Sequence, residues 1–165
     1  MADDYQRFRE VLVEMHRTGG TRRDVSAVLP TLTGQKKIAL YPKLMEGYRH
    51  WSGRKGAEWF EPAYAVWRHG KLGLRVNPEL GLKIKGVPHL IKLYFKQESL
   101  AKTRIDIITH LMAVACGEQA PEGCVMGVLD IRQSKLIKPT VPIDGLDTML
   151  RAEAAYWISA WDELG

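Results

Sequence analysis

The segment "PHLIKLYFKQ", Pro88 to Gln97, alternates along most of its length with the period of two that is typical of a β-strand. One row of side chains is apolar and contains Ile91, Leu93 and Phe95. The other row contains Leu90, Lys92, Tyr94 and Lys96. We therefore predict a strand over residues 89–95, with one face in the core and a second face that presents lysines to solvent or to an anion.

The preceding strand is predicted to form a hairpin with this one. Its core face contains Leu80, Leu82 and Ile84, and the intervening "KGVP" has the composition of a turn. With Val87 and Pro88 in the loop, the core face pairs Leu80 with Phe95, Leu82 with Leu93, and Ile84 with Ile91. The opposite face then pairs Glu79 with Lys96, Gly81 with Tyr94, and Lys83 with Lys92.

This register gathers Glu79 and three lysines on one surface of the sheet. Two lysines directly opposite each other destabilise a sheet unless an anion or a carboxylate lies nearby. The surface therefore indicates an anion-binding site. The alternative is a solvated sheet face with an exposed Glu79–Lys96 salt bridge, which would contribute little to stability.

The rest of the chain predicts an α+β fold. Helices are expected over residues 4–16, 21–29, 34–51, 99–116 and 146–164. Strands are expected over residues 63–68, 72–76, 80–84, 89–95 and 124–131, and a short strand ends at residue 138. The first four strands would form an antiparallel β-meander, which a crossover helix extends by a further strand, and the remaining helices flank the sheet.

We expect one domain over residues 1–165, because a chain of this length buries a core of its own and no linker or repeat interrupts it. Its parts are an N-terminal helical part at 1–50, a sheet with its crossover helix at 57–138, and a C-terminal helix at 145–164.

The composition is that of a globular protein, with 45% apolar and 26% charged residues. The apolar runs are far shorter than the roughly 18 residues that a membrane span needs. The segment "MADDYQRFRE" is acidic and polar, unlike a signal peptide. Cys116 and Cys124 are too few for a disulfide framework and lack zinc-ligand spacing, so a cytoplasmic location is expected.

The charges are distributed unevenly along the chain. Residues 34–104 contain fifteen basic and five acidic side chains, whereas residues 105–165 contain four basic and nine acidic ones. A basic middle section of this kind indicates a surface that binds phosphate or another polyanion. The alternative is a solvated basic face without a partner.

One family shares these features over residues 36–131. The predicted order is a helix, a meander, a crossover helix and a further strand. Glu79 lies in "NPELG", and Lys92 follows it thirteen residues later in "LIKLYFK". This arrangement resembles the core of the PD-(D/E)XK nuclease superfamily, which is restriction-endonuclease-like. The resemblance implies Glu79 as the first acid, Lys92 or Lys96 as the motif lysine, and Glu46 as the helix acid. It further implies that Glu79 and Glu46 hold Mg²⁺, which takes oxygen ligands.

The motif is incomplete in this sequence. The family places an acid two residues before the motif lysine, but Leu90 precedes Lys92 and Tyr94 precedes Lys96 at that spacing. A further carboxylate would have to come from elsewhere, and the candidates are Glu61, Glu98, Asp106 and Asp130. We therefore predict binding in preference to cleavage, with no cofactor unless the nuclease site is active.

The leading functional hypothesis is a nucleic-acid-binding protein with a degenerate nuclease-like fold. Its contacts with nucleic acid would come from Arg54 and Lys55 in the loop "SGRKG", and from Lys83, Lys92 and Lys96. An ordinary polar loop is the alternative for "SGRKG".

Two other hypotheses remain open. The protein could be an interaction module or regulatory subunit that binds an acidic partner, with its acidic C-terminal third facing another copy in a homodimer. It could also be an active metal-dependent nuclease, in which Glu79, Lys92 and Lys96 are catalytic. Trp157 and Trp161 share a helical face, which indicates packing or a dimer contact.

Overall fold

The computed structural model describes residues 5–19, 35–53, 55–139 and 145–164. Helices are α1 (Gln6–Arg17), α3 (Gln35–Ser52), α4 (Lys102–Cys116) and α5 (Leu146–Leu164). Strands are β1 (Glu58–Trp59), β2 (Ala65–His69), β3 (Leu72–Val76), β4 (Leu80–Ile84), β5 (Val87–Tyr94), β6 (Val125–Asp130) and β7 (Lys135–Ile137). The α+β class is confirmed, and the helix predicted at 21–29 lies outside the described residues.

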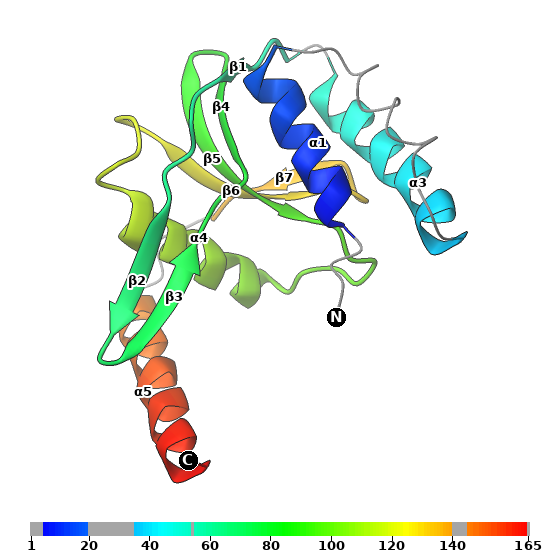
Figure 1. Ribbon diagram of the computed structural model, residues 1–165. Coiled ribbons are helices and arrows are strands. Elements are labelled where there is room, and N and C mark those ends of the chain that lie inside the picture. Colours follow the sequence, from blue (N-terminus) through cyan, green and yellow to red (C-terminus); the bar gives the residue numbers. More distant parts are fainter. Residues whose placement is uncertain (1–4, 20–34, 54, 140–144, 165) are drawn as a thin grey trace.

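The main sheet has five strands in the order β1-β4-β5-β6-β7 (Figure 1). All neighbouring strands are antiparallel except β5 and β6, which are parallel and are joined by α4. The predicted crossover through a helix is therefore confirmed. A parallel pair needs such a connection, because the chain must return to the same end of the sheet before it can form the next strand.

The predicted four-strand meander is wrong, because β2 and β3 pair with each other in a separate two-stranded sheet, the β2–β3 ribbon. Asn77 and Pro78 separate β3 from β4, and proline has no N–H to continue a hydrogen-bonded ladder. The free edge of β4 is instead paired with the short strand β1, through Glu58 with Lys83 and Trp59 with Leu82.

Helices cover both faces of the sheet. On one face, α1 and α3 pack against the sheet through a core that includes Phe8, Leu12, Tyr41, Leu44, Tyr48, Leu80, Leu82, Ile91, Leu93 and Leu129. On the other face, Leu90 is fully buried in a cluster with Met112 and Cys116 of α4 and with Trp67 of the ribbon. The expectation that the second face of β5 is open is therefore wrong around Leu90, because the crossover helix packs back onto it.

The register of β4 and β5 differs by four residues from the predicted one. Leu80 pairs with Ile91, and Leu82 pairs with His89. The loop is the two residues Lys85 and Gly86, which have φ angles of 50° and 80°. Positive φ at both positions suits a two-residue hairpin turn. The sequence "KGVP" alone is equally compatible with this turn and with a turn centred two residues later. An even displacement keeps every side chain on its predicted face but changes its partner.

The contact between α3 and the turn after β6 depends on a glycine. A Cβ atom on Gly47 would lie 2.0 Å from the carbonyl oxygen of Ile131, which is backbone and cannot move aside. The hydroxyl of Ser134 also donates a hydrogen bond to the carbonyl of Gly47 at 2.8 Å. Gly47 therefore lets the backbone of α3 touch the turn after β6 directly.

Helix α1 contacts α3 through a partly buried polar pair. The ring of His16 is hydrogen-bonded to the hydroxyl of Tyr48, whose residue is 1% exposed. Burial lowers the pKa of His16 from 6.5 to about 4, because the charged imidazolium loses its hydration there. His16 is therefore neutral in the folded protein near pH 7.

The substitution Gly47→Ala tests the contact of α3 with the sheet. In an open helix this change stabilises by about 1 kcal/mol. Here we expect a loss of about 2 kcal/mol, which is typical of an overpacked contact. Urea unfolding measures the difference. The variant Ser134→Ala, which removes only the hydrogen bond, should cost about 1 kcal/mol, and a gain in stability for Gly47→Ala would contradict the contact.

The stability of the protein should fall as the pH is lowered from 7 to 4. The folded-state pKa of His16, about 4, lies below the ordinary value of 6.5, so the unfolded chain binds more protons in this interval. At 1.36 kcal/mol per pKa unit, the full loss attributable to His16 is about 3 kcal/mol. Unfolding free energies of the native protein and of His16→Gln across this range measure it. Parallel curves for the two proteins would rule out the effect.

Candidate nucleic-acid interface

Glu79 lies at the centre of a charged cluster at the start of β4. Its carboxylate is 2.8 Å from Nζ of Lys92 and 3.3 Å from Nε of Arg9, which reaches it from α1. The backbone N–H of Leu93 donates to the second carboxylate oxygen at 2.9 Å. The Glu79 side chain is only 7% exposed, whereas those of Arg9 and Lys92 are 30% and 34% exposed.

This cluster completes the hydrogen bonding of β5. The pairing of β4 with β5 begins at Leu80, which follows Glu79 in the chain. The N–H of Leu93 lies just beyond this pairing, and it donates to the carboxylate of Glu79 instead. Lys92 also donates to the carbonyl of Asn77 at 3.3 Å, and the guanidinium of Arg9 lies 5.3 Å from the centre of the Phe95 ring. The predicted Glu79–Lys96 pair is wrong, because Glu79 is opposite Lys92.

The carboxylates near Glu79 do not form a magnesium site. Both oxygens of Glu79 are engaged by cations or by a backbone N–H, and Glu46 is exposed on α3. Within the described ranges, no group of three His, Cys, Asp or Glu side chains could hold a metal ion. Mg²⁺ requires several oxygen ligands around it. The donor set therefore does not fit Mg²⁺, and we derive no cleavage step at Glu79.

The acids considered as additional metal ligands serve other roles or lie apart. Glu61 forms an exposed ion pair with Arg17 at 3.3 Å, and Glu98 is exposed. Asp130 is buried, and one of its oxygens accepts the N–H of Gln133 at 3.1 Å in the turn that leads to β7. Asp106 is buried on α4. None of them joins Glu79 in a group that could hold a metal ion.

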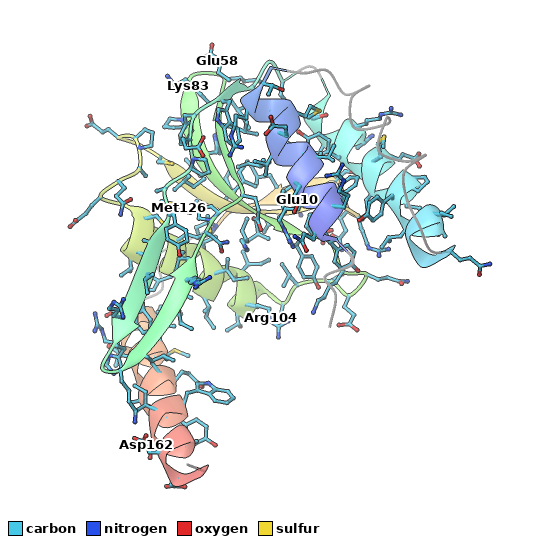
Figure 2. All side chains as sticks on the ribbon, in the orientation of Figure 1. Glu10, Glu58, Lys83, Arg104, Met126 and Asp162 are labelled. Carbon is cyan, nitrogen blue, oxygen red and sulfur yellow. The ribbon has the colours of Figure 1, made fainter. Side chains whose placement is uncertain are left out.

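The predicted phosphate-binding lysines are spread along the sheet. Lys83 is exposed opposite Pro88, four residues before Lys92 on β5, which corresponds to about 13 Å along a strand. Figure 2 shows Lys83 beside Glu58 at one end of the sheet. Lys96 is exposed beyond the other end of β5. The expected opposition of Lys83 and Lys92 is therefore wrong.

The loop residues of the predicted interface are only partly described. Lys55 places its ammonium 5.5 Å from the centre of the Trp51 ring, so its charge is held against an aromatic face. Arg54 lies outside the described residues. The sequence therefore named basic residues that the structure distributes over several elements.

The β2–β3 ribbon concentrates basic charge, which the sequence analysis did not single out. Residues 65–76, "AVWRHGKLGLRV", contain Arg68, Lys71 and Arg75 and no acidic residue. Trp67 and Val76 point into the core beneath the ribbon, so strand alternation turns Arg68 and Arg75 to its outer face. In the part of the chain that the structure describes, neither arginine forms an ion pair.

Two exposed side chains accompany these arginines. Val66, which pairs with Arg75, is 38% exposed, and Tyr64 just before β2 is 56% exposed. The ribbon projects away from the five-stranded sheet (Figure 1). A signal for this surface was present in the sequence, as a hairpin with basic residues on both strands and without a compensating acid.

Comparisons of the chain with protein-family models, with curated proteins and with solved structures found no match. The resemblance to the PD-(D/E)XK superfamily therefore stays a prediction. Among the helices that the structure describes, none combines the length and the apolar character needed to cross a membrane.

The substitution Glu79→Ala should destabilise the protein by about 2–3 kcal/mol, because it leaves two cations and a backbone N–H without their shared acceptor. Urea unfolding measures this loss. Glu14→Ala removes an exposed carboxylate that is paired with Arg17 on the same helix, and it should change stability by less than about 0.5 kcal/mol. Unchanged stability of Glu79→Ala, with loss of a Mg²⁺-dependent cleavage activity, would contradict the structural role.

Proposed function

We propose that the protein binds nucleic acid without cutting it, and that the outer face of the β2–β3 ribbon makes the main contact. The observation that carries the proposal is the pair Arg68 and Arg75, which lie on one exposed face of a projecting hairpin without an ion-pair partner among the described residues. Arginine forms bidentate hydrogen bonds with phosphate and with the edge of guanine.

The dimensions of the ribbon support this function. A two-stranded β-ribbon is narrow enough to enter the major groove of DNA. Arg68 and Arg75 are on diagonal positions across the two strands, because Arg68 pairs with Gly73 and Arg75 pairs with Val66. Such positions are about 7–8 Å apart, so both guanidinium groups can reach one stretch of backbone. Tyr64 provides an exposed ring on which an unpaired base can stack.

The exposed lysines of the sheet have a different role in this proposal. Lys83 and Lys96 are too far apart to form one site, but they add to the positive field of the basic middle section. Such a field increases the rate at which a polyanion approaches, and salt weakens it. We place this activity in the cytoplasm, in keeping with the two free thiols of Cys116 and Cys124.

The double variant Arg68→Ala/Arg75→Ala tests the ribbon contact. Fluorescence anisotropy with labelled duplex DNA, duplex RNA and single-stranded DNA, between about 50 and 200 mM salt, gives the affinity and its salt dependence. We expect the double variant to lose about tenfold or more in affinity, and the slope of log affinity against log salt to become shallower by about two.

The matched control is Lys83→Ala/Lys96→Ala, which removes the same charge from two exposed positions of the main sheet. It should weaken binding by less than about threefold. Equal losses in both variants would show that the ribbon is not the main contact. If the protein binds none of the three nucleic acids at low salt, the proposed nucleic-acid binding is overturned. If the ribbon then retains an acidic protein, the result favours an interaction module.

A second candidate function is protein–protein interaction, and a separate surface supports it. An open apolar groove of about 810 Å³ lies between the inner face of the ribbon, α4 and α5. Trp157 of α5 lines this groove and is 63% exposed, and the neighbouring residue Tyr156 is 66% exposed. Apolar surface gathered in one place is more typical of a contact with another protein than of a free monomer surface. A homodimer is the simplest form of this second function.

A further inference from the structure

Gly73 leaves a gap in the outer face of the β2–β3 ribbon. The paired residues on this face are Val66 and Arg68 of β2, together with Gly73 and Arg75 of β3. Glycine weakens a strand, because it loses the most conformational freedom on folding and has no side chain to pack. An exposed glycine inside β3 therefore requires a physical reason.

The backbone of the ribbon does not supply that reason. The five residue pairs of β2 and β3 follow one another without interruption, so the ribbon has no bulge at Gly73. The φ angle of Gly73 lies outside the positive range that favours glycine. A glycine in a strand that has neither feature often marks a place where a ligand approaches closely.

The guanidinium of Arg68 lies where a larger side chain at position 73 would extend. A Cβ atom on Gly73 would lie 3.5 Å from Nη1 of Arg68 and 3.3 Å from Cγ1 of Val66. Arg68 pairs directly with Gly73, so its side chain reaches across the ribbon to β3. Because glycine has no side chain, this path is open.

The path brings the guanidinium of Arg68 toward Arg75. Arg75 lies on the same face of β3, two residues beyond Gly73, which corresponds to about 7 Å along a strand. Residues 65–76 contain no acid, and neither arginine forms an ion pair among the described residues. Two cations on one strip of β3 repel each other unless an anion lies between them.

The outer face of the ribbon offers hydrogen-bond donors and no side-chain acceptor. Val66 is apolar, Gly73 has no side chain, and a guanidinium group only donates. Base pairs present both donors and acceptors in the grooves of DNA, whereas a phosphate presents acceptors alone. The face therefore complements the phosphodiester backbone more closely than it complements a particular base sequence.

We propose that Gly73 is a positioning residue for Arg68. It keeps the guanidinium of Arg68 over β3, so that Arg68 and Arg75 together bind the phosphodiester backbone whatever the base sequence. A guanidinium that is already in place loses less conformational freedom on binding, so a glycine that weakens the strand strengthens the complex. The inference rests on the nucleic-acid binding proposed above and specifies the chemical group that the ribbon binds.

The test variant is Gly73→Val, and fluorescence anisotropy with labelled duplex DNA between about 50 and 200 mM salt measures its binding. The valine methyl groups should displace the guanidinium of Arg68, whereas valine suits a strand better than glycine. We expect an affinity loss of at least about threefold, and a slope of log affinity against log salt that is shallower by about one. The urea midpoint should be no lower than that of the native protein.

A second variant at the same position grades the effect. In Gly73→Ala the added Cβ would lie 3.5 Å from Nη1 of Arg68, which is an ordinary contact distance, so the guanidinium keeps its place. Gly73→Ala should therefore lose less affinity than Gly73→Val. An equal or larger loss in Gly73→Ala would overturn the inference.

A double-mutant cycle with Arg68→Ala separates positioning from a direct effect of the valine. In the Arg68→Ala background, Gly73→Val should change the affinity by less than about twofold, because the group on which it acts is gone. The matched control Ala113→Val adds bulk at an exposed position of α4 and should bind as the native protein does. Equal losses from Gly73→Val in both backgrounds would overturn the inference.

The same measurements separate this failure from failure of the proposed function. If the native protein binds no nucleic acid at about 50 mM salt, the function and the inference both fail. If Arg68→Ala/Arg75→Ala loses affinity but Gly73→Val binds as the native protein does, the function stands and the inference alone fails. Duplexes of equal length and different sequence should bind within about threefold of one another, and a larger preference would overturn the backbone contact.

Discussion

Burial of both faces of β5 is the constraint on which the other elements depend. Ile91 and Leu93 pack beneath α1 and α3, and Leu90 packs beneath α4. A strand covered on both faces has no solvated side on which to place a charge. Lys92 can therefore occupy this strand only near its end, where its ammonium reaches solvent and the carboxylate of Glu79.

The resulting cluster explains why an acid and a lysine occur at a nuclease-like spacing without a complete nuclease motif. Glu79 accepts the N–H of Leu93 and neutralises Lys92 and Arg9, so it joins α1 to β4 and β5. A carboxylate used in this way is surrounded by cations and a donor, which is the reverse of the oxygen-rich environment that Mg²⁺ needs. Arg68 and Arg75, which form no ion pair among the described residues, are exposed elsewhere, on the outer face of the ribbon.

The two proposed surfaces use opposite sides of that ribbon. Its inner side closes the apolar groove through Trp67 and Leu74, whereas its outer side presents Arg68 and Arg75. Strand alternation separates the two kinds of side chain, because neighbouring residues point to opposite faces. A small element can therefore contribute to a protein contact and to a polyanion contact without competition for the same side chains.

The sequence by itself determined most of the elements and which side chains share a face of each strand, but it did not predict the short strand β1. The period of the apolar residues located β3, β4 and α5, because side-chain period depends only on local backbone geometry. It also placed the crossover helix between β5 and β6. The tertiary structure alone decided the β4–β5 register, the separation of the ribbon and the partner of Glu79. The separation of the ribbon and the partner of Glu79 depend on which edges and faces of the sheet other elements cover. The register was open because a pattern of period two fits equally well all strand pairings that differ by an even number of residues.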